Sequence, residues 1–212
     1  MSQLTGVSVL TDIIESPADV MQLLSALMQA CPKLSSLLLE FDLDIQVPPV
    51  VSESRIQMEH LTPLLACSTL TVFSLDYLYA LAFDDKDIEE MTSHLKELEV
   101  LSLNPYVKET PKPKKSLTLE SLLSFAHHCP RIRELGLFLS QADVTVITSE
   151  EILAKFLSTS LHWWFHVGNS YITHPMKVAF FLREILPLGA EIDYCELCPG
   201  WEQVNLLFSS ID

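Results

Sequence analysis

Two cysteines near the end of the chain have a spacing that can do chemistry. Cys195 and Cys198 form a C-x-x-C pair, a spacing found in zinc sites and in thioredoxin-like redox centres. A structural zinc site needs four ligands, and the sequence has no second cysteine pair, so His162, His166 or His174 would have to complete it. A redox pair of this kind belongs to a different fold. We therefore expect no metal site.

Two other clusters of reactive side-chain types have structural explanations. His127 and His128 precede Cys129, an arrangement that could activate a nucleophile, but histidines at a helix end are also favoured by the helix dipole. The acidic run at residues 84–87 lacks the glycine and the terminal glutamate of a calcium loop, and it suits a helix start instead. Five scattered glycines make no phosphate-binding loop. We expect no catalytic residue, no cofactor and no enzyme activity.

A repeated apolar pattern sets the elements that would position any site. Its clearest copy begins at Leu98 and reads L-x-x-L-x-L-N, the pattern of a leucine-rich repeat. The same frame recurs, with spacings of 27 to 36 residues, from Leu4, Leu34, Leu70, Ile132, His162 and Gly189. The pattern predicts one α/β leucine-rich-repeat domain over residues 1–212. This solenoid would have about six to seven coils, with a curved parallel sheet inside and helices outside.

Capping residues predict where the intervening helices begin. Ser16 before Pro17, the acidic run at 84–87 and Thr118 each precede an apolar stripe at helical spacing. Shorter or later helices are expected at residues 60–67, 149–156 and 175–185.

Side chains alternate along a strand, so the repeat frame separates the core face from the opposite, concave face. The flanking positions are small in several units, including Ser8, Ser74, Ser102 and Gly136, which predicts an accessible sheet surface. In the later units they are aromatic and acidic instead. The candidate protein-binding residues are Glu134, Phe138, Trp164, His166, Glu191 and Asp193.

Aromatic rings beside carboxylates suit a basic, partly apolar peptide or protein surface. The alternative interpretation is that Trp164 packs under a loop and that the acidic residues are merely solvated. A shift of one residue in this strand would exchange the two faces.

Composition limits the classes of partner. With 49% hydrophobic and 19% charged residues, the 212-residue chain can bury a continuous core. A net charge of −15 disfavours nucleic acid and anionic membranes, because phosphate binding needs clustered lysine and arginine. The longest uncharged segment, residues 156–176, is too polar to span a membrane, and no secretory signal is visible. We expect a cytoplasmic or nuclear protein with a protein partner.

The repeat pattern also predicts the surroundings of three cysteines and of one basic segment. Cys31, Cys67 and Cys129 occupy the same repeat position, just before the strand, where small buried residues would stack. Residues 106–116 hold four lysines and two prolines and predict an exposed, extended loop between repeats. A contact of this loop with a phosphate or an acidic partner is the less favoured interpretation.

At its repeats the chain resembles the leucine-rich-repeat region of fungal F-box-type proteins, over roughly residues 19–208. The stretches that carry the resemblance are His60–Cys67, Leu98–Pro105, Ser116–Leu119, His128–Leu137 and Val167–Ser170. The resemblance implies substrate recognition for a cullin-type ubiquitin ligase, in which the repeats bind the target and an F-box binds the ligase adaptor.

No F-box is visible in the chain, whose first residues already belong to a repeat. An adaptor contact is therefore expected only if a longer form carries an F-box. The alternative function is a structural or degenerate repeat fragment that has no partner and no activity of its own.

Overall fold

The computed structural model describes residues 4–11, 15–41, 55–107, 115–140, 142, 156, 162–198 and 200–209. Its seven strands form one sheet and are β1 (Gly6–Thr11), β2 (Ser36–Phe41), β3 (Val72–Asp76), β4 (Val100–Leu103), β5 (Glu134–Leu137), β6 (Trp163–Gly168) and β7 (Ala190–Tyr194). The α-helices in these ranges are α1 (Pro17–Ala30), α2 (Met58–Leu61), α3 (Asp85–His94), α4 (Ser121–His128), α5 (Pro175–Ile185) and α6 (Trp201–Ser209). A 3-10 helix, η2 (Thr62–Ala66), continues α2.

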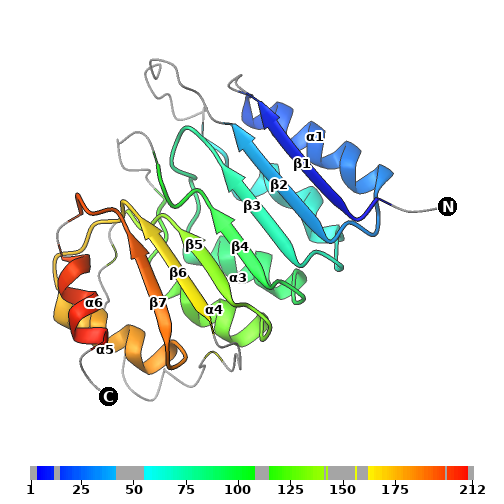
Figure 1. Cartoon of the computed structure of the whole chain (residues 1–212). Helices are drawn as coiled ribbons and strands as arrows, with labels where there is room; N and C mark the ends of the chain where they lie inside the picture. Colours follow the sequence, from blue (N-terminus) through cyan, green and yellow to red (C-terminus); the bar gives the residue numbers. More distant parts are fainter. Residues whose placement is uncertain are drawn as a thin grey trace.

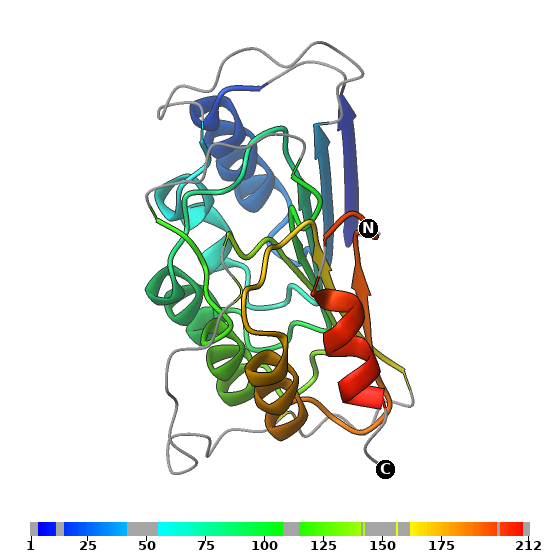
Figure 2. The ribbon, with the colours of Figure 1, turned by 90° about the vertical axis from the view of Figure 1, so that its left-hand side faces the viewer.

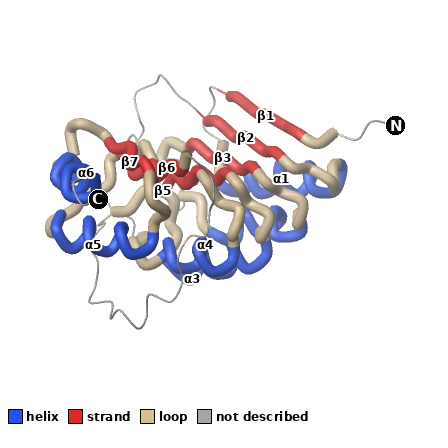
Figure 3. The backbone as a smooth tube through the Cα atoms, turned by 60° about the horizontal axis from the view of Figure 1, so that its bottom comes forward, coloured by secondary structure: helices blue, strands red, loops and turns tan. Residues whose placement is uncertain are grey.

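The order of the strands across the sheet is their order along the chain, and every neighbouring pair is parallel (Figure 1). Helices α1, α3, α4 and α5 form a layer on one side of the sheet, as the side view shows (Figure 2). Helix α6 lies beside α5 at the β7 end (Figure 3). The opposite side of the sheet, called the open face below, carries none of these four helices.

The register across the sheet matches the alignment of the repeat frame. Cα partners run without a break through Val7, Leu37, Phe73, Leu101, Leu135, Phe165 and Ile192. These residues are the second apolar position of every unit. The frame is interrupted only between His166 and Gly168, where a bulge shifts β6 against β7. The prediction of a parallel α/β sheet in this register is therefore confirmed.

The core lies between the sheet and the helix layer. Leu37, Phe73, Leu101, Leu135 and Phe165 are all 0% exposed, so the aligned positions form one buried row. Burying each such side chain contributes about 1.5–3 kcal/mol to folding. The described ranges contain no helix that could span a membrane.

The predicted helix starts at Ser16 and in the acidic run are confirmed. Ser16 and Asp19 form a capping box at the start of α1, and Asp84 and Asp87 form one at the start of α3. These reciprocal hydrogen bonds satisfy backbone N–H groups that have no partner within the helix.

The prediction that Thr118 caps a helix is wrong by about one turn. Helix α4 begins at Ser121, after a turn in which the Thr118 hydroxyl accepts a hydrogen bond from the Glu120 N–H. The Asp85 carboxylate contacts this turn, where it accepts hydrogen bonds from the Thr118 hydroxyl at 2.6 Å and from the Thr118 N–H at 2.9 Å. The residues before α4 are thereby tied to the start of α3.

The basic segment is only partly described. Residues 108–114 of the expected loop, and residues 149–155 of an expected helix, lie outside the described residues. At the loop's start the prediction of exposure is wrong for Val107, which is 3% exposed. At its end Lys115 pairs with Asp84 at 3.4 Å and with Asp87 at 3.3 Å.

The prediction of stacked, buried cysteines holds for two of the three. Cys67 and Cys129 are buried, and their thiols donate to the carbonyl oxygens of Leu34 and Leu95 in the preceding unit. Cys31 is only half-buried. It belongs to the second unit, whose neighbour is the incompletely covered strand β1.

Candidate protein-binding surface

The strand register gathers five of the six predicted binding residues on the open face of β5, β6 and β7. Trp164 is the Cα partner of Glu134 on one side and of Glu191 on the other. His166, two residues further along β6, is the partner of Asp193. We call these five residues the late-strand surface.

Two aromatic rings form the centre of this surface. The Trp164 indole and the His166 imidazole are stacked, with ring centroids 6.0 Å apart and an interplanar angle of 9°. Trp164 remains 37% exposed, so it does not pack under a loop, and the alternative interpretation is wrong for this residue. The strand is in the predicted register, because Trp163 and Phe165 on the other side of β6 are 1% and 0% exposed.

The carboxylates surround these rings. His166 Nδ1 lies 2.9 Å from an Asp193 oxygen, and its Nε2 lies 3.6 Å from a Glu134 oxygen. The imidazole thus bridges β5 and β7, and both contacts are ion pairs only when it is protonated. Even a protonated His166 adds only one positive charge to a surface with three acidic side chains, since Glu191 is exposed beside Trp164. The surface carries net negative charge.

Phe138 is the predicted residue that the structure does not bring into the cluster. It lies one position past the end of β5 and is half-buried. Among the described residues, no ring contact joins it to Trp164 or His166.

Tyr106 is 48% exposed, as predicted for its loop, and it also contacts the late-strand surface. Its hydroxyl donates a hydrogen bond to Asp193. Two glycines, one in β5 and one in β6, leave room for the segment just before Tyr106. A Cβ on Gly136 would lie 3.2 Å from Pro105 Cγ, and a Cβ on Gly168 would lie 1.9 Å from the Pro105 carbonyl oxygen.

Gly136 is therefore buried beneath Pro105, which corrects the prediction of an accessible surface at this strand. Gly168 also has a φ of 50°, which glycine adopts without strain. No signal in the sequence indicated Tyr106. In an irregular segment no strand or helix periodicity predicts which way a side chain points.

Hydrogen bonding and burial act against each other at Asp193. Burial alone would raise its pKa, but the hydrogen bonds from His166 and Tyr106 and the positive charge of His166 outweigh burial and hold the pKa below its ordinary value. Burial, together with the hydrogen bond to Asp193, raises the pKa of Tyr106. Asp193 is thus a carboxylate and Tyr106 a phenol at neutral pH.

A cavity of about 170 Å³ adjoins the late-strand surface, with Tyr106, the partner of Asp193, in its lining. Its lining residues are Glu40, Phe41, Asp76, Tyr77, Leu78, Asn104 and Tyr106. Glu40 and Asp76 are Cα partners on β2 and β3. Acidic and aromatic side chains therefore extend from β7 towards β2 along the carboxyl ends of the strands.

Other candidate sites show structural contacts. Burial raises the pKa of Cys129 to about 12, so the thiol beside His128 stays protonated, and His128 pairs with Glu89 at 2.7 Å. Cys195 and Cys198 are free thiols, and burial raises the pKa of Cys198. In the described ranges no group of three or more His, Cys, Asp or Glu side chains could hold a metal ion.

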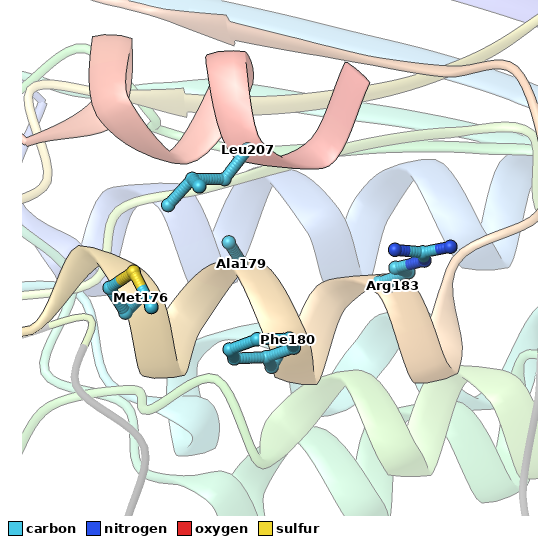
Figure 4. A pocket seen from close by; sticks show the side chains of 5 residues that line it. All are labelled: Met176, Ala179, Phe180, Arg183 and Leu207. Carbon is cyan, nitrogen blue, oxygen red and sulfur yellow. The ribbon is translucent and has the colours of Figure 1, made fainter. Parts of the chain in front are cut away.

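A groove between α5 and α6 is too small for a ligand. Ala179 and Leu207 approach each other across it, with Met176, Phe180 and Arg183 at its sides (Figure 4). Its volume of about 10 Å³ is no more than one water molecule needs.

No protein-family model matches the chain, and no curated protein matches it.

Proposed function

We propose that this chain is a non-enzymatic protein-recognition scaffold of leucine-rich repeats. Its ligand is a basic, partly apolar protein segment that binds the late-strand surface. The observation that carries the proposal is the exposed Trp164 side chain, held between the strand partners Glu134 and Glu191. An aromatic ring with flanking carboxylates can take the apolar stem of a lysine or arginine on its face and pair its charged end.

Two features support the repeat assignment. The strand order never reverses, whereas doubly wound sheets have a switch point at which it does. The aligned apolar positions also remain partners through every strand pair, as stacking of similar units requires.

The resemblance to F-box-type repeats extends this proposal to a substrate-recognition role for a ubiquitin ligase. The repeats would hold the target, and the adaptor contact would belong to an F-box in a longer form. A cytoplasmic or nuclear location fits this role. The five free cysteines agree with such a location, because these compartments keep thiols reduced.

The second candidate function is a structural repeat fragment without a partner of its own. The observation that favours it is the exposed edge at β1, where Leu10 is 70% exposed. Unprotected edges of this kind are a route to aggregation.

Affinity capture with matched variants separates the two functions. The tagged chain is purified from the cells that express it, beside Trp164→Ala and Glu191→Lys, and bound proteins are identified by mass spectrometry. Glu90→Lys, an exposed charge reversal on α3, is the control. We expect a partner that wild type and Glu90→Lys retain and that both late-strand variants lose.

Ligase adaptor in the same eluate would support the ubiquitin-ligase role. A partner retained equally by all four proteins would overturn the assigned surface. No enriched partner from well-folded protein would contradict recognition and favour the structural fragment.

A further inference from the structure

In the part of the chain that the structure describes, strand β1 is an open edge of the sheet. Within the described ranges it pairs only with β2. The Thr5 carbonyl oxygen accepts a hydrogen bond from the Ser36 N–H at 3.0 Å, so the backbone groups of odd-numbered residues point towards β2. Because these groups alternate along a strand, those of Gly6, Ser8 and Leu10 point to the free side.

In its described residues β1 lacks three usual protections of an edge strand. From Leu4 to Thr11 the sequence has no charged residue and no proline, and the pairing with β2 has no bulge. Leu4 is 57% exposed and Leu10 is 70% exposed. A chain with net charge −15 thus presents an uncharged, apolar strand at its edge.

The core next to this edge is also incompletely covered. Val7 and Val9 are half-buried, whereas their partners Leu37 and Leu39 on β2 are 0% and 1% exposed. On the helix behind β1, Leu27 of α1 is likewise half-buried. The apolar surface therefore extends from the strand into the helix layer. A partner that covers it must have both a strand and a helix layer of its own.

We propose that β1 pairs with β1 of a second copy of this chain, antiparallel, around a twofold axis at Ser8. In this register Ser8 faces Ser8, Gly6 faces Leu10 and Val7 faces Val9 of the second copy. The even-numbered pairs exchange the outward-pointing backbone hydrogen bonds, and the valines take the closer non-hydrogen-bonded positions. A twofold interface needs a self-complementary surface, and Val-Ser-Val is symmetric about Ser8.

The size of the facing side chains fits this pairing. Leu10 of one copy lies opposite Gly6 of the other on the open face, where a Cβ added to Gly6 would meet only Ser36 Cβ at 3.9 Å. The exposed leucine can therefore lie over the glycine without displacing another side chain. On the core side the two valine pairs cover one another.

Charge favours the antiparallel direction. The first described acidic residues after the strand are Glu15 and Asp19, at the carboxyl end of β1 and the start of α1. Antiparallel pairing places these groups of the two copies at opposite ends of the interface, whereas parallel pairing would bring like charges together.

The dimer would also change how the chain binds. A twofold axis perpendicular to the sheet keeps both helix layers on one side and both open faces on the other. Two late-strand surfaces then face the same way, so a ligand with two basic segments gains avidity if it spans the distance.

Sedimentation equilibrium of the full chain tests the proposal. Wild type should show twice the monomer mass in a concentration-dependent equilibrium. Ser8→Lys should raise the dissociation constant by roughly tenfold or more, because two lysines then face each other at the axis. Leu206→Lys, on the 65% exposed Leu206 of α6, is the control and should dimerise like wild type.

A cysteine at the axis gives a second, independent readout. Hydrogen-bonded antiparallel partners have Cα atoms about 5.5 Å apart, within disulfide reach, so Ser8→Cys should form a covalent dimer under mild oxidation. Wild type, with its five free cysteines, is the control and should not. A folded wild type that stays monomeric, a dimer indifferent to Ser8→Lys, or an open-ended series of oligomers would each overturn the proposal.

Discussion

At the scale of single residues, the late-strand surface is a set of mutually dependent side chains. His166 holds its place through Asp193 and Glu134, and its ring supports the Trp164 indole from one side. Tyr106 in turn donates a hydrogen bond to Asp193. A rigid aromatic anchor loses little conformational freedom on binding, which is why such residues dominate binding energies.

Asp193 gives this arrangement a defined pH dependence. Its pKa in the folded chain is lowered, so the ionised carboxylate stabilises the fold above its unfolded pKa of about 4, and this contribution disappears as the pH falls through the folded value. Asp193→Asn should therefore cost about 0.5–1 kcal/mol at pH 7, a figure that allows for solvent screening of a partly exposed group.

Urea unfolding at pH 7 and at about pH 3 checks this expectation, since the difference between wild type and variant should shrink in acid. Glu191→Gln, which removes an exposed carboxylate of the same surface, is the control. A difference between wild type and Asp193→Asn that is constant or larger at low pH would contradict the role given to this carboxylate.

At the scale of elements, the surface depends on segments that cross the sheet. The stretch after β4 passes over Gly136 of β5 and against Gly168 of β6 before Tyr106 meets Asp193 of β7. Asn169 secures the same crossing, because its side-chain N–H donates to the Val107 carbonyl at 2.6 Å. One irregular segment thus ties three strands to each other.

Gly168→Ala tests this crossing. The added Cβ would meet the Pro105 carbonyl oxygen at 1.9 Å in a residue with φ of 50°, so we expect a loss of about 3 kcal/mol in the free energy of unfolding. Gly189→Ala is the matched control, because Gly189 also has a positive φ of 82° but nothing within 4 Å of the added Cβ. It should cost about 1 kcal/mol. Equal losses in chemical denaturation would show that the close approach to Pro105 is unimportant.

The sequence was sufficient for the parts of the molecule that repeat. Apolar spacing reports burial, so it predicted the row from Leu37 to Ile192, and strand alternation then placed Glu134, Trp164 and Asp193 on the open face. It failed where the backbone leaves that period. The bulge after His166 ends the frame before Tyr194, and the direction of Tyr106 depends on contacts with residues far along the chain.

At the scale of the whole molecule, the uncharged strand β1 and the late-strand carboxylates lie at opposite ends of the sheet. The net charge is −15, yet β1 carries no charged residue, while carboxylates gather at β5 to β7 at the other end of the sheet. The two ends therefore suit different interactions: an electrostatic one with a basic ligand and an apolar one with a second copy.

These two interactions should respond to salt in opposite directions. Raising the ionic strength from about 0.05 to 0.5 M screens the late-strand carboxylates and should weaken binding of a basic peptide by roughly tenfold. The same change screens repulsion between two acidic chains and should strengthen the β1 dimer. Peptide titration and sedimentation in the same buffers measure both, and a dimer that weakens with salt would point to charged contacts instead.

Recognition of a basic segment by the late-strand surface can be tested by a titration with two short peptides, one of alternating lysine and leucine and one with glutamate replacing lysine. Fluorescence anisotropy of the labelled peptides gives their affinities for wild type, Trp164→Ala and the control Glu90→Lys. We expect wild type and Glu90→Lys to bind only the lysine peptide and Trp164→Ala to lose about 30-fold in affinity, the size of a strong anchor's contribution. Equal binding of both peptides, or a lysine-peptide affinity that Trp164→Ala leaves unchanged, would contradict this mode of recognition.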